Sequence, residues 1–321
     1  MSMKESIIVL IIDITNNFMK AWIQAFRLRT LPLAISSILL ANLMAYKVLQ
    51  GFFSFEIFWL TILTTVLLQI LSNLANDYGD AVNGADHEGR KGPQRAVQSG
   101  EISKESMKRA IYIFSILSFV SGIGLLYKSI STLEEFLYFI GLGVLAIIAA
   151  ITYTAGKKPY GYAGLGDLSV LIFFGWVGVL GSYYLQVGEL DVTLLFPATA
   201  CGLLAVAVLN VNNIRDIESD IEAGKKSIPV RLGRKWAVMY HWLLLFSAII
   251  CGLCYVYFNY ESPLQWLFVI IFSLLRKNGW AVTRLKEPSE LDPYLKQMAI
   301  TSLLFSILFG VTQLLPLYFQ F

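Results

Sequence analysis

The stretch "NLANDYGDAVNGAD" (residues 73–86) follows directly on the apolar run "FWLTILTTVLLQILS" (residues 58–72). Such a run is typical of a helix that crosses a lipid bilayer, which needs roughly 20 mainly apolar residues. Four polar residues of the stretch recur at helical intervals, so they lie on one face of the same helix. Acidic groups at the C-terminal end of a helix oppose its dipole. The stretch therefore predicts a membrane helix whose end carries a functional site. The four residues are Asn73, Asn76, Asp77 and Asp80.

The composition extends this prediction to the whole chain of 321 residues. The chain is 56% hydrophobic and 15% charged, with a mean hydropathy of +0.64, whereas about a quarter of the residues of a soluble domain are charged. The sequence predicts an all-α, polytopic membrane protein that forms one domain over residues 1–321, because its spans leave too little chain for a soluble domain. The nine predicted spans are residues 32–50, 56–76, 110–127, 133–153, 166–186, 192–212, 237–258, 264–282 and 298–319.

The N-terminal segment differs from these spans. Its apolar run "SIIVLIIDITNNF" (residues 6–18) is broken by Asp13 and is too short to cross a bilayer, and no small-residue cleavage site follows it. We expect residues 1–27 to form an interfacial segment. The alternative is a poor mimic of a signal peptide.

The basic residues predict the orientation. Of the 25 Lys and Arg residues, all but Lys47 and Lys128 fall on the side of the predicted spans where the N-terminus lies. The positive-inside rule places that side in the cytoplasm, and nine spans then place the C-terminus on the opposite side. The predicted partner is the lipid bilayer. The net charge of +3 indicates little about other partners, and no part of the sequence resembles a nucleic-acid-binding module.

A second acidic patch follows the sixth predicted span, in "LNVNNIRDIESDIEAGKKSIPVRLGR" (residues 209–234). Asn212, Asp216 and Asp220 recur every four residues, with Asn213 beside them. Carboxylate and carboxamide oxygens without His or Cys ligands suit a hard cation such as Mg²⁺, which binds one or two carboxylates and completes its shell with water and substrate phosphates. Two facing patches would hold two or more Mg²⁺ ions against a diphosphate. The alternative is that both patches are solvated helix ends.

Basic residues near the patches predict phosphate contacts. Arg95 lies in "GPQRAVQSG", Lys157 in "TAGKKPYGY" and Lys225 in "EAGKKSIPVRLG". Arginine grips phosphate oxygens in a fork, and lysine acts as a point charge. Their neighbours Lys158 and Lys226 are able to take the same role. The alternative for each is that it only contributes to the positive-inside signal.

Asp167 lies where the fifth span begins, and ionisable residues at membrane depth are usually functional. Near it lie three glycines and three tyrosines, Tyr153, Tyr160 and Tyr162. The glycines, at positions 161, 164 and 166, predict an irregular loop or a close backbone approach. An N-cap is the alternative for Asp167, and an interfacial aromatic belt is the alternative for the three tyrosines.

These patterns resemble the UbiA superfamily of intramembrane aromatic prenyltransferases, and within it the branch that acts on 1,4-dihydroxy-2-naphthoate. The superfamily pattern N-D-x-x-D-x-x-x-D is matched by Asn76, Asp77 and Asp80, but position 84 is Gly and the next acid is Asp86. The second motif, D-x-x-x-D, falls on Asp216 and Asp220. The blocks that carry the resemblance are "LRTLPLA" (28–34), "LQILSNLANDYGDAVNGAD" (68–86), "GPQRAVQSG" (92–100), "AAITYTAGKKPYGYAGLGDLSVLIFFGW" (149–176) and "FPATACGLLAVAVLN" (196–210) with the acidic stretch that follows it.

The resemblance implies a Mg²⁺-dependent transfer of a polyprenyl group from polyprenyl diphosphate to 1,4-dihydroxy-2-naphthoate, with loss of CO₂ and diphosphate, which gives demethylmenaquinol. It implies a central chamber with cytoplasmic active-site loops, in a bacterial cytoplasmic (inner) membrane. The implied metal ligands are Asn76, Asp77, Asp80, Asp216 and Asp220, of which the four aspartates are also the expected catalytic residues. The expected substrate-binding residues are Asn73, Arg95, Tyr153, Lys157, Asp167 and Lys225.

Three alternatives stay open at this point. One is a related enzyme with another acceptor, such as 4-hydroxybenzoate, haem or a chlorophyll precursor. The second is an ion-coupled secondary transporter, which predicts acids near the middle of the bilayer and broken helices. The third is a structural membrane protein, which has no use for two matched acidic patches.

Overall fold

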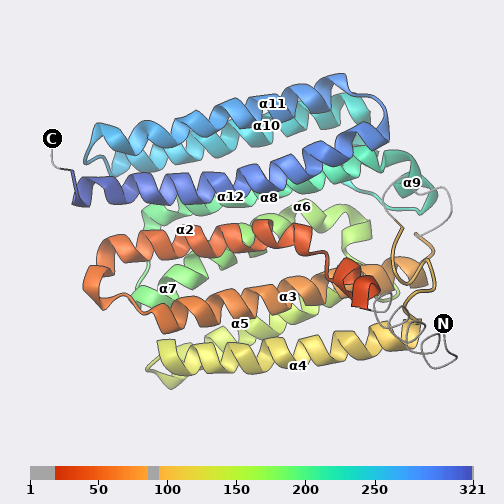
Figure 1. The fold of residues 1–321 in the computed structure, drawn as a ribbon, viewed down its shortest axis with the longest axis horizontal. Coiled ribbons are helices and arrows are strands. Elements are labelled where there is room, and N and C mark those ends of the chain that lie inside the picture. The colour runs from red at the N-terminus through yellow and green to blue at the C-terminus, as the bar shows by residue number, and fades with distance from the viewer. Residues whose placement is uncertain (1–18, 86–93, 320–321) are drawn as a thin grey trace, which may run out of the picture.

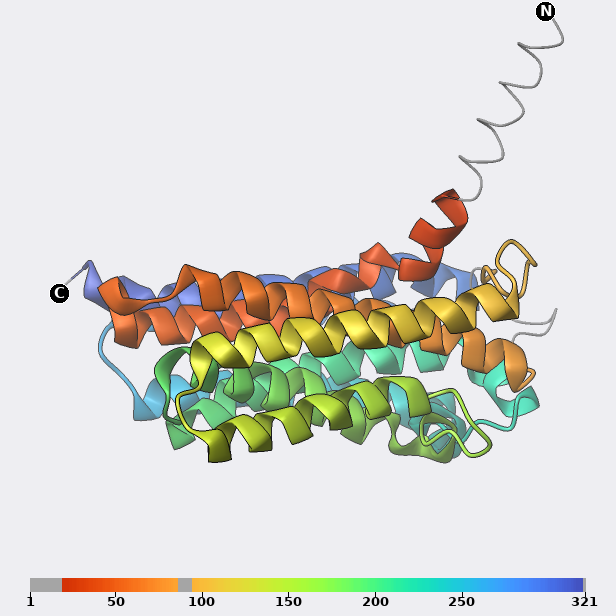
Figure 2. The ribbon, with the colours of Figure 1, turned by 90° about the horizontal axis from the view of Figure 1, so that it is seen from below.

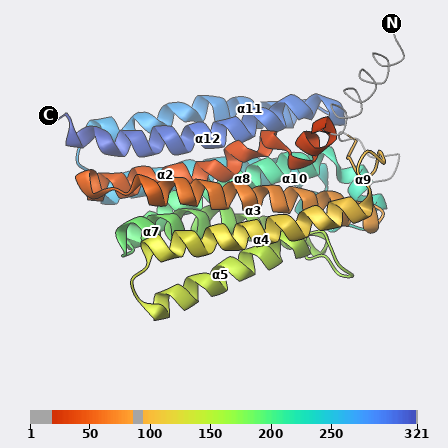
Figure 3. The same cartoon turned by 60° about the horizontal axis from the view of Figure 1, so that its bottom comes forward.

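The computed structural model describes residues 19–85 and 94–319, which contain helices and no strand. The long helices lie side by side in one bundle (Figures 1 and 3). Among the described residues, eight helical stretches are long and apolar enough to cross a membrane. This arrangement confirms the predicted all-α, polytopic membrane fold. The long helices are α2 (Leu31–Leu49), α3 (Phe55–Val82), α4 (Lys104–Ser129), α5 (Leu133–Thr152), α8 (Leu195–Arg215), α10 (Ile228–Phe258) and α12 (Asp292–Leu314).

The fifth predicted span is a composite rather than one α-helix. It runs through η3 (Gly161–Leu165, π-helical), α6 (Gly166–Val170), η4 (Leu171–Gly181, π-helical) and α7 (Ser182–Val187). π-Helical turns are rare and often occur at functional sites. This span therefore departs from regular geometry in the same region where the sequence places Asp167 and its glycines.

The eighth predicted span is also irregular. It begins with the 3₁₀-helix η6 (Pro263–Ile271) and continues as the short helix α11 (Phe272–Arg284). The Ser262 side chain accepts a hydrogen bond from the backbone N–H of Leu264, so the start is capped. α11 lies beside α10 at the edge of the bundle (Figure 1). This segment stands where the eighth span is predicted, but it is not among the eight stretches that are long and apolar enough to cross a membrane.

Local sequence signals explain where several helices begin. The side chains of Ser54, Ser103 and Thr132 accept hydrogen bonds from backbone N–H groups at the starts of α3, α4 and α5. α2, α10 and α12 each carry a proline in their first turn, where the missing N–H costs nothing.

Helix α8 lies at the centre of the packing, against α10, α12 and η4. Small residues allow the close approach, as expected between membrane helices. A Cβ on Gly202 of α8 would lie 3.0 Å from the Cα of Gly175 in η4. By contrast α5, which the structure describes in full, has no buried residue. The bundle therefore has a tight side around α8 and a thin wall at α5.

The two ends of the bundle differ in charge. At the end opposite the acidic patches, Lys47 pairs with Glu261 at 2.7 Å and Lys128 pairs with Glu56 at 3.0 Å. These lysines are the two that the sequence separates from the other basic residues. The start of the described chain, residues 19–26, is helical and leaves the bundle at an angle to α2 (Figure 2). Most of the predicted interfacial segment, residues 1–18, lies outside the described residues.

Candidate functional site

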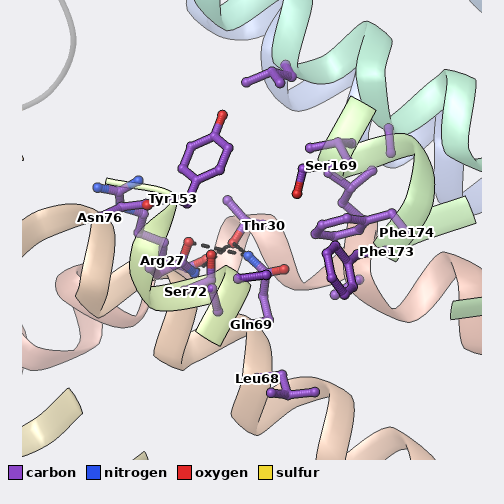
Figure 4. A pocket seen from close by; sticks show the side chains of 18 of the residues that line it. Arg27, Thr30, Leu68, Gln69, Ser72, Asn76, Tyr153, Ser169, Phe173 and Phe174 are labelled. Carbon is purple, nitrogen blue, oxygen red and sulfur yellow. Dashed lines mark hydrogen bonds between the residues drawn. The ribbon is translucent and has the colours of Figure 1, made fainter. Parts of the chain in front are cut away.

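A cavity of about 960 Å³ opens at the acidic end of the bundle, which agrees with the predicted central chamber. Its apolar wall comes from α5 and η4, and includes Ala146, Phe173, Phe174 and Val177. Figure 4 shows Phe173, Phe174 and Ser169 across the chamber from a polar wall. Sequence reasoning did not identify that polar wall, which is formed by Arg27, Thr30, Gln69 and Ser72. Both acidic patches line the same cavity, with Asn76, Asp77, Asp80, Asn212, Asn213, Asp216 and Asp220.

The two acidic patches meet through Lys225. The Lys225 Nζ lies 3.4 Å from Asp80 Oδ1 at the end of α3, and 3.4 Å from Asp220 Oδ1 in the short helix α9 (Ile217–Glu222). The same ammonium lies 4.9 Å from the ring centre of Tyr162. The structure thus brings together Asp80, Asp220 and Lys225, three of the predicted site residues.

Asp80 is the most heavily engaged of these carboxylates. It is 2% exposed and accepts hydrogen bonds from the Arg95 guanidinium and the Tyr162 hydroxyl. Arg95 also donates to the backbone carbonyl of Asn76 at 2.9 Å. The predicted proximity of Arg95 to the first patch is confirmed. Tyr162 stands in the glycine-rich stretch that the sequence singles out beside Asp167, but its contact with Asp80 was not predicted.

Asp216 is held by its neighbour in sequence. Arg215 donates from Nε and Nη2 to the two carboxylate oxygens of Asp216, each at 2.7 Å. The same guanidinium donates to Asn212 Oδ1 at 2.8 Å and to Asp292 Oδ1, at the start of α12, at 2.6 Å. The sequence treats Arg215 only as a basic residue near a loop. Its position three residues after Asn212, on the acidic face, is the signal that would have identified it.

The helix breaks at Asp216, so the second patch is not one continuous helical face as its spacing predicts. α8 ends at Arg215 and α9 begins at Ile217. The Asp220 N–H still donates to the Asp216 carbonyl at 2.8 Å, and the Lys225 N–H donates to the Asp220 carbonyl at 2.8 Å. The chain thus turns back on itself and directs Lys225 toward Asp220.

Asn76 and the loop after α5 are packed closely together. The Thr154 hydroxyl donates to Asn76 Oδ1 and to the Ala75 carbonyl, both at 3.0 Å. A Cβ on Gly79 would lie 2.5 Å from the backbone carbonyl of Thr154. Only glycine at position 79 allows α3 to approach this loop, and the approach fixes the turn of α3 that carries the first patch.

Asn73 lies one turn earlier on the same helix and lines the chamber. Its side-chain amide donates to the Phe26 carbonyl at 2.9 Å and to Thr30 Oγ1 at 3.0 Å. These contacts tie α3 to the chain segment before α2. Its substrate-binding role stays a prediction.

Tyr153 and Asp167 both line the chamber. The Tyr153 ring packs edge-on against Tyr160, with centroids 5.3 Å apart, and a Cβ on Gly166 would lie 2.7 Å from the Tyr153 hydroxyl. The predicted close approach at this glycine is therefore present. Asp167 Oδ2 accepts a hydrogen bond from the Tyr240 hydroxyl at 3.0 Å. The alternative reading of Asp167 as an N-cap is wrong, because the cap position of α6 is Leu165.

Lys157 is not brought into this group. It is exposed on the loop after α5, as is Lys158, and neither lines the chamber. Asp86, the displaced third acid of the first motif, lies outside the described residues. The basic residues that the structure places against the patches are Arg95, Arg215 and Lys225.

The electrostatics of the site favour a bound cation. Burial raises the pKa of the Asp220 carboxyl above its usual range; the nearby Lys225 ammonium opposes this shift, and the carboxylates of Asp216 and Asp80 add to it. Within residues 19–85 and 94–319, no three acidic, His or Cys side chains converge closely enough to ligate one metal ion. The oxygen-only donors still fit Mg²⁺, since that ion typically takes one or two carboxylates with water and substrate phosphates.

Comparisons with known proteins agree with this geometry. Residues 34–305 match the model of the UbiA prenyltransferase family. A protein of Escherichia coli (strain K12), 1,4-dihydroxy-2-naphthoate octaprenyltransferase, is 48% identical over 90% of this chain and 94% of its own length. The apo structure of a UbiA homolog from Aeropyrum pernix K1 is 18% identical, with a TM-score of 0.64 over 88% of this chain and 98% of that one. A UbiA homolog from Archaeoglobus fulgidus, solved with DMAPP and Mg²⁺, is 20% identical, with a TM-score of 0.53 over 89% of this chain and 99% of that one.

Proposed function

This chain belongs to the UbiA prenyltransferase family, and we propose that it transfers a polyprenyl group from polyprenyl diphosphate to 1,4-dihydroxy-2-naphthoate. In this reaction the C–O bond to diphosphate breaks, and a C–C bond forms at the ring carbon that bears the carboxylate. Diphosphate and CO₂ leave, and the product is demethylmenaquinol. The relative in Escherichia coli, which carries the name of this activity, supports the choice of acceptor.

The observation that carries the proposal is the meeting of the two patches at the mouth of an apolar chamber. Asp80 and Asp220 approach the same ammonium of Lys225, although 139 intervening positions separate the two carboxylates in the sequence. A site of this kind suits a molecule that has an anionic head, which the cations bind, and an apolar tail, which lies in the chamber. A polyprenyl diphosphate has both parts.

We assign Mg²⁺ to the oxygen donors of the two patches. When bound, Mg²⁺ neutralises charge on the leaving diphosphate, which is the usual contribution of a metal to phosphate-ester chemistry. The donor set contains no soft ligand, which favours Mg²⁺ over transition metals. The assigned ligands are Asn76, Asp77, Asp80, Asp216 and Asp220.

The basic side chains of the site have a role separate from that of the metal. Arg95 and Lys225 lie against Asp80, at the height of the chamber where the diphosphate would bind. Their charges stabilise the developing negative charge from fixed positions, and this is worth more in a water-poor site than in solution. Lys157 is less well placed for a phosphate contact than Arg95 and Lys225, because it is exposed and does not line the chamber.

Cleavage of the C–O bond would leave an allylic carbocation on the prenyl group, and the chamber walls would exclude water from it. Tyr153, Phe173 and Phe174 line the cavity, and the faces of aromatic rings attract cations. We assign Tyr153, Asp167 and Asn73 to the binding of the acceptor and donor. The tail leaves the chamber laterally into lipid.

We propose that the whole of residues 1–321 forms one prenyltransferase domain. The chamber lining supports this, because it extends from Ile23 before α2 to Ala299 in α12. The distribution of basic residues supports an N-terminus in the cytoplasm and a C-terminus across the membrane. We place the protein in the bacterial cytoplasmic membrane, with the acidic patches at the cytoplasmic face.

The experiment gives purified protein 1,4-dihydroxy-2-naphthoate, a polyprenyl diphosphate and Mg²⁺, with 4-hydroxybenzoate as the competing acceptor. We expect prenylated naphthoquinol and release of CO₂, both abolished by EDTA and restored by Mg²⁺. Prenylation of the benzoate alone would overturn the assigned acceptor. Failure with both acceptors would overturn the assigned reaction.

A further inference from the structure

A second set of residues, most of them polar, lies outside the chamber, on one face of α11. Ser273, Arg276, Lys277, Trp280 and Arg284 line a groove on the surface of the bundle. Their spacing of three, four, seven and eleven residues from Ser273 places them on one helical face. All five side chains are exposed, and none of them lines the chamber.

The opposite face of α11 packs against the bundle. Its buried residues include Leu275, Asn278 and Val282, and the Asn278 Oδ1 accepts a hydrogen bond from His241 Nε2 at 3.0 Å. α11 lies at the outer edge of the bundle (Figure 1). The basic face therefore lies on the outer surface of the bundle.

Two of the cations, Arg276 and Lys277, lie within α11 rather than at its C-terminal end. Arg276 precedes Arg284, the last residue of α11, by eight residues, which is about 12 Å along the axis at 1.5 Å per residue. Exposed Leu267 and Ile270 precede them on the way into the bilayer. Charged side chains at this depth are costly and require a counter-ion. The ion pairs among the described residues include none with Arg276, Lys277 or Arg284.

The wall of the groove is fixed by aromatic contacts. The Trp280 ring lies edge-on to Trp242, with centroids 5.9 Å apart, and the Arg284 guanidinium lies 4.9 Å from the Trp280 ring. The Trp242 indole N–H donates to Thr283 Oγ1 at 3.0 Å. The groove is thus preorganised, with one cation stacked on a tryptophan and two more a turn or two away.

We propose that this groove binds the phosphate headgroup of an anionic phospholipid. The lipid belongs to the leaflet at the acidic end of the bundle, because α11 ends shortly before Asp292, the partner of Arg215. Arg276 and Lys277 supply charge to the phosphate, and Ser273 supplies a hydroxyl. The acyl chains lie along the apolar surface of η6 near Leu267 and Ile270. Basic pockets at the membrane edge commonly recognise anionic headgroups.

Native mass spectrometry of the purified full chain tests this site, with phosphatidylglycerol and phosphatidylcholine offered in equal amounts. We expect the wild type to retain phosphatidylglycerol in preference to phosphatidylcholine. Arg276→Gln with Lys277→Gln should weaken phosphatidylglycerol binding by about 30-fold, taking about 1 kcal/mol for each cation near an anionic surface. Arg276→Lys keeps the charge and should retain most of the binding.

The matched control is Lys104→Gln with Lys108→Gln, which removes two exposed cations from α4 and should leave retention unchanged. Equal retention in the Arg276 and Lys277 double variant would overturn the site. An equal loss in the Lys104 and Lys108 control would show a general charge effect and would also overturn it. Displacement of the lipid by millimolar inorganic phosphate would identify free phosphate as the ligand and overturn the choice of a lipid.

Discussion

At the scale of single residues, Lys225 is the cation on which both acidic patches depend. Its ammonium has equal distances of 3.4 Å to Asp80 Oδ1 and Asp220 Oδ1, and it lies over Tyr162. Two buried carboxylates repel each other unless a cation is shared between them. The same lysine is therefore needed for the patches to approach each other and for an anionic head to bind beside them.

We expect Lys225→Gln to lower kcat/KM for polyprenyl diphosphate by roughly 10- to 100-fold, since a hydrogen bond to a charged group is worth about 1.5–3 kcal/mol. Steady-state kinetics at several donor concentrations measure this change. Lys226→Gln is the matched control, because Lys226 is exposed and adjacent, and its activity should stay within about twofold of wild type. Equal losses in the two variants would contradict the role given to Lys225.

The sequence predicts some of these residues and misses others for a physical reason. Asp80, Asp220 and Lys225 stand in short motifs, so their chemistry is visible from spacing alone. The contact of Arg215 with Asp292 joins positions 77 residues apart, and no local pattern encodes it. Lys157 and Lys225 stand in similar Gly-Lys-Lys contexts, yet only Lys225 reaches the patches, because α9 turns its loop back toward the chamber.

At the scale of elements, the turn of α3 that carries Asn76 and Asp80 is placed by a missing side chain. A Cβ at position 79 would lie 2.5 Å from both the carbonyl carbon and oxygen of Thr154, and 2.8 Å from the N of Ala155. These are backbone atoms, so they cannot move aside as the end of a flexible side chain does. The helix itself would have to shift, and the first patch would shift with it.

We expect Gly79→Ala to destabilise the protein by about 1–3 kcal/mol, the usual cost of overpacking, and to reduce activity. Thermal unfolding in detergent and turnover at saturating Mg²⁺ measure the two effects. Gly141→Ala in α5 is the control, since nothing lies within 4 Å of its added Cβ, and it should be neutral or slightly stabilising. A fully active, equally stable Gly79→Ala variant would mean that this contact does not position the patch.

A second junction joins the α8–α9 turn to α12 through Arg215. This guanidinium is nearly buried and holds Asp216 in a two-bond fork while it also bonds Asp292. Removing one partner of a buried ion pair typically costs about 3–5 kcal/mol, because the remaining charge has no compensation. The fork also fixes the orientation of Asp216, which we assign as a metal ligand.

We expect the loss of activity to be smallest in Asp292→Asn, larger in Arg215→Lys and largest in Arg215→Gln. Asp292→Asn leaves the fork intact. Arg215→Lys keeps the charge but loses the fork, which lysine cannot form, and Arg215→Gln loses both. Turnover and the half-saturating concentration of Mg²⁺ should both be measured, with the larger Mg²⁺ requirement in the Arg215 variants. If Arg215→Gln raised only the KM for the donor, Arg215 would instead contact the diphosphate directly.

Hydropathy predicts the existence of these elements better than their irregularities. The apolar runs locate the spans because a bilayer core admits few other structures than helices. The break at Asp216 depends on the contacts that its side chain and α12 make with Arg215. The hydropathy of the sequence does not reveal these contacts. The π-helical turns of η4 likewise depend on packing, where Gly175 meets Gly202 of α8.

At the scale of the whole molecule, the bundle separates a closed side from an open one. α8 is packed on several sides, whereas α5 has no buried residue and contributes one face to the chamber wall and the other to the membrane. A long polyprenyl chain is too large to be enclosed with its head at the acidic end. The polyprenyl chain would therefore reach the lipid through the thin wall at α5, where it disrupts the packing of the bundle least.

Two adjacent residues of α5 test this division. Ala146 lines the chamber, whereas Leu145 is 59% exposed on the other face. We expect Ala146→Phe to narrow the passage and to reduce kcat/KM for an octaprenyl donor at least about tenfold, since a bulky group in a filled space costs about 1–3 kcal/mol. Geranyl diphosphate has a much shorter chain, and we expect its activity to be mostly kept. Leu145→Phe adds a ring of the same size on the lipid side and should change neither value.

Competition between the two donors in one assay gives the ratio of their kcat/KM values directly. A loss of both donors in Ala146→Phe would mean that this face of α5 borders the reacting centre, and no loss of either would mean that the tail leaves elsewhere.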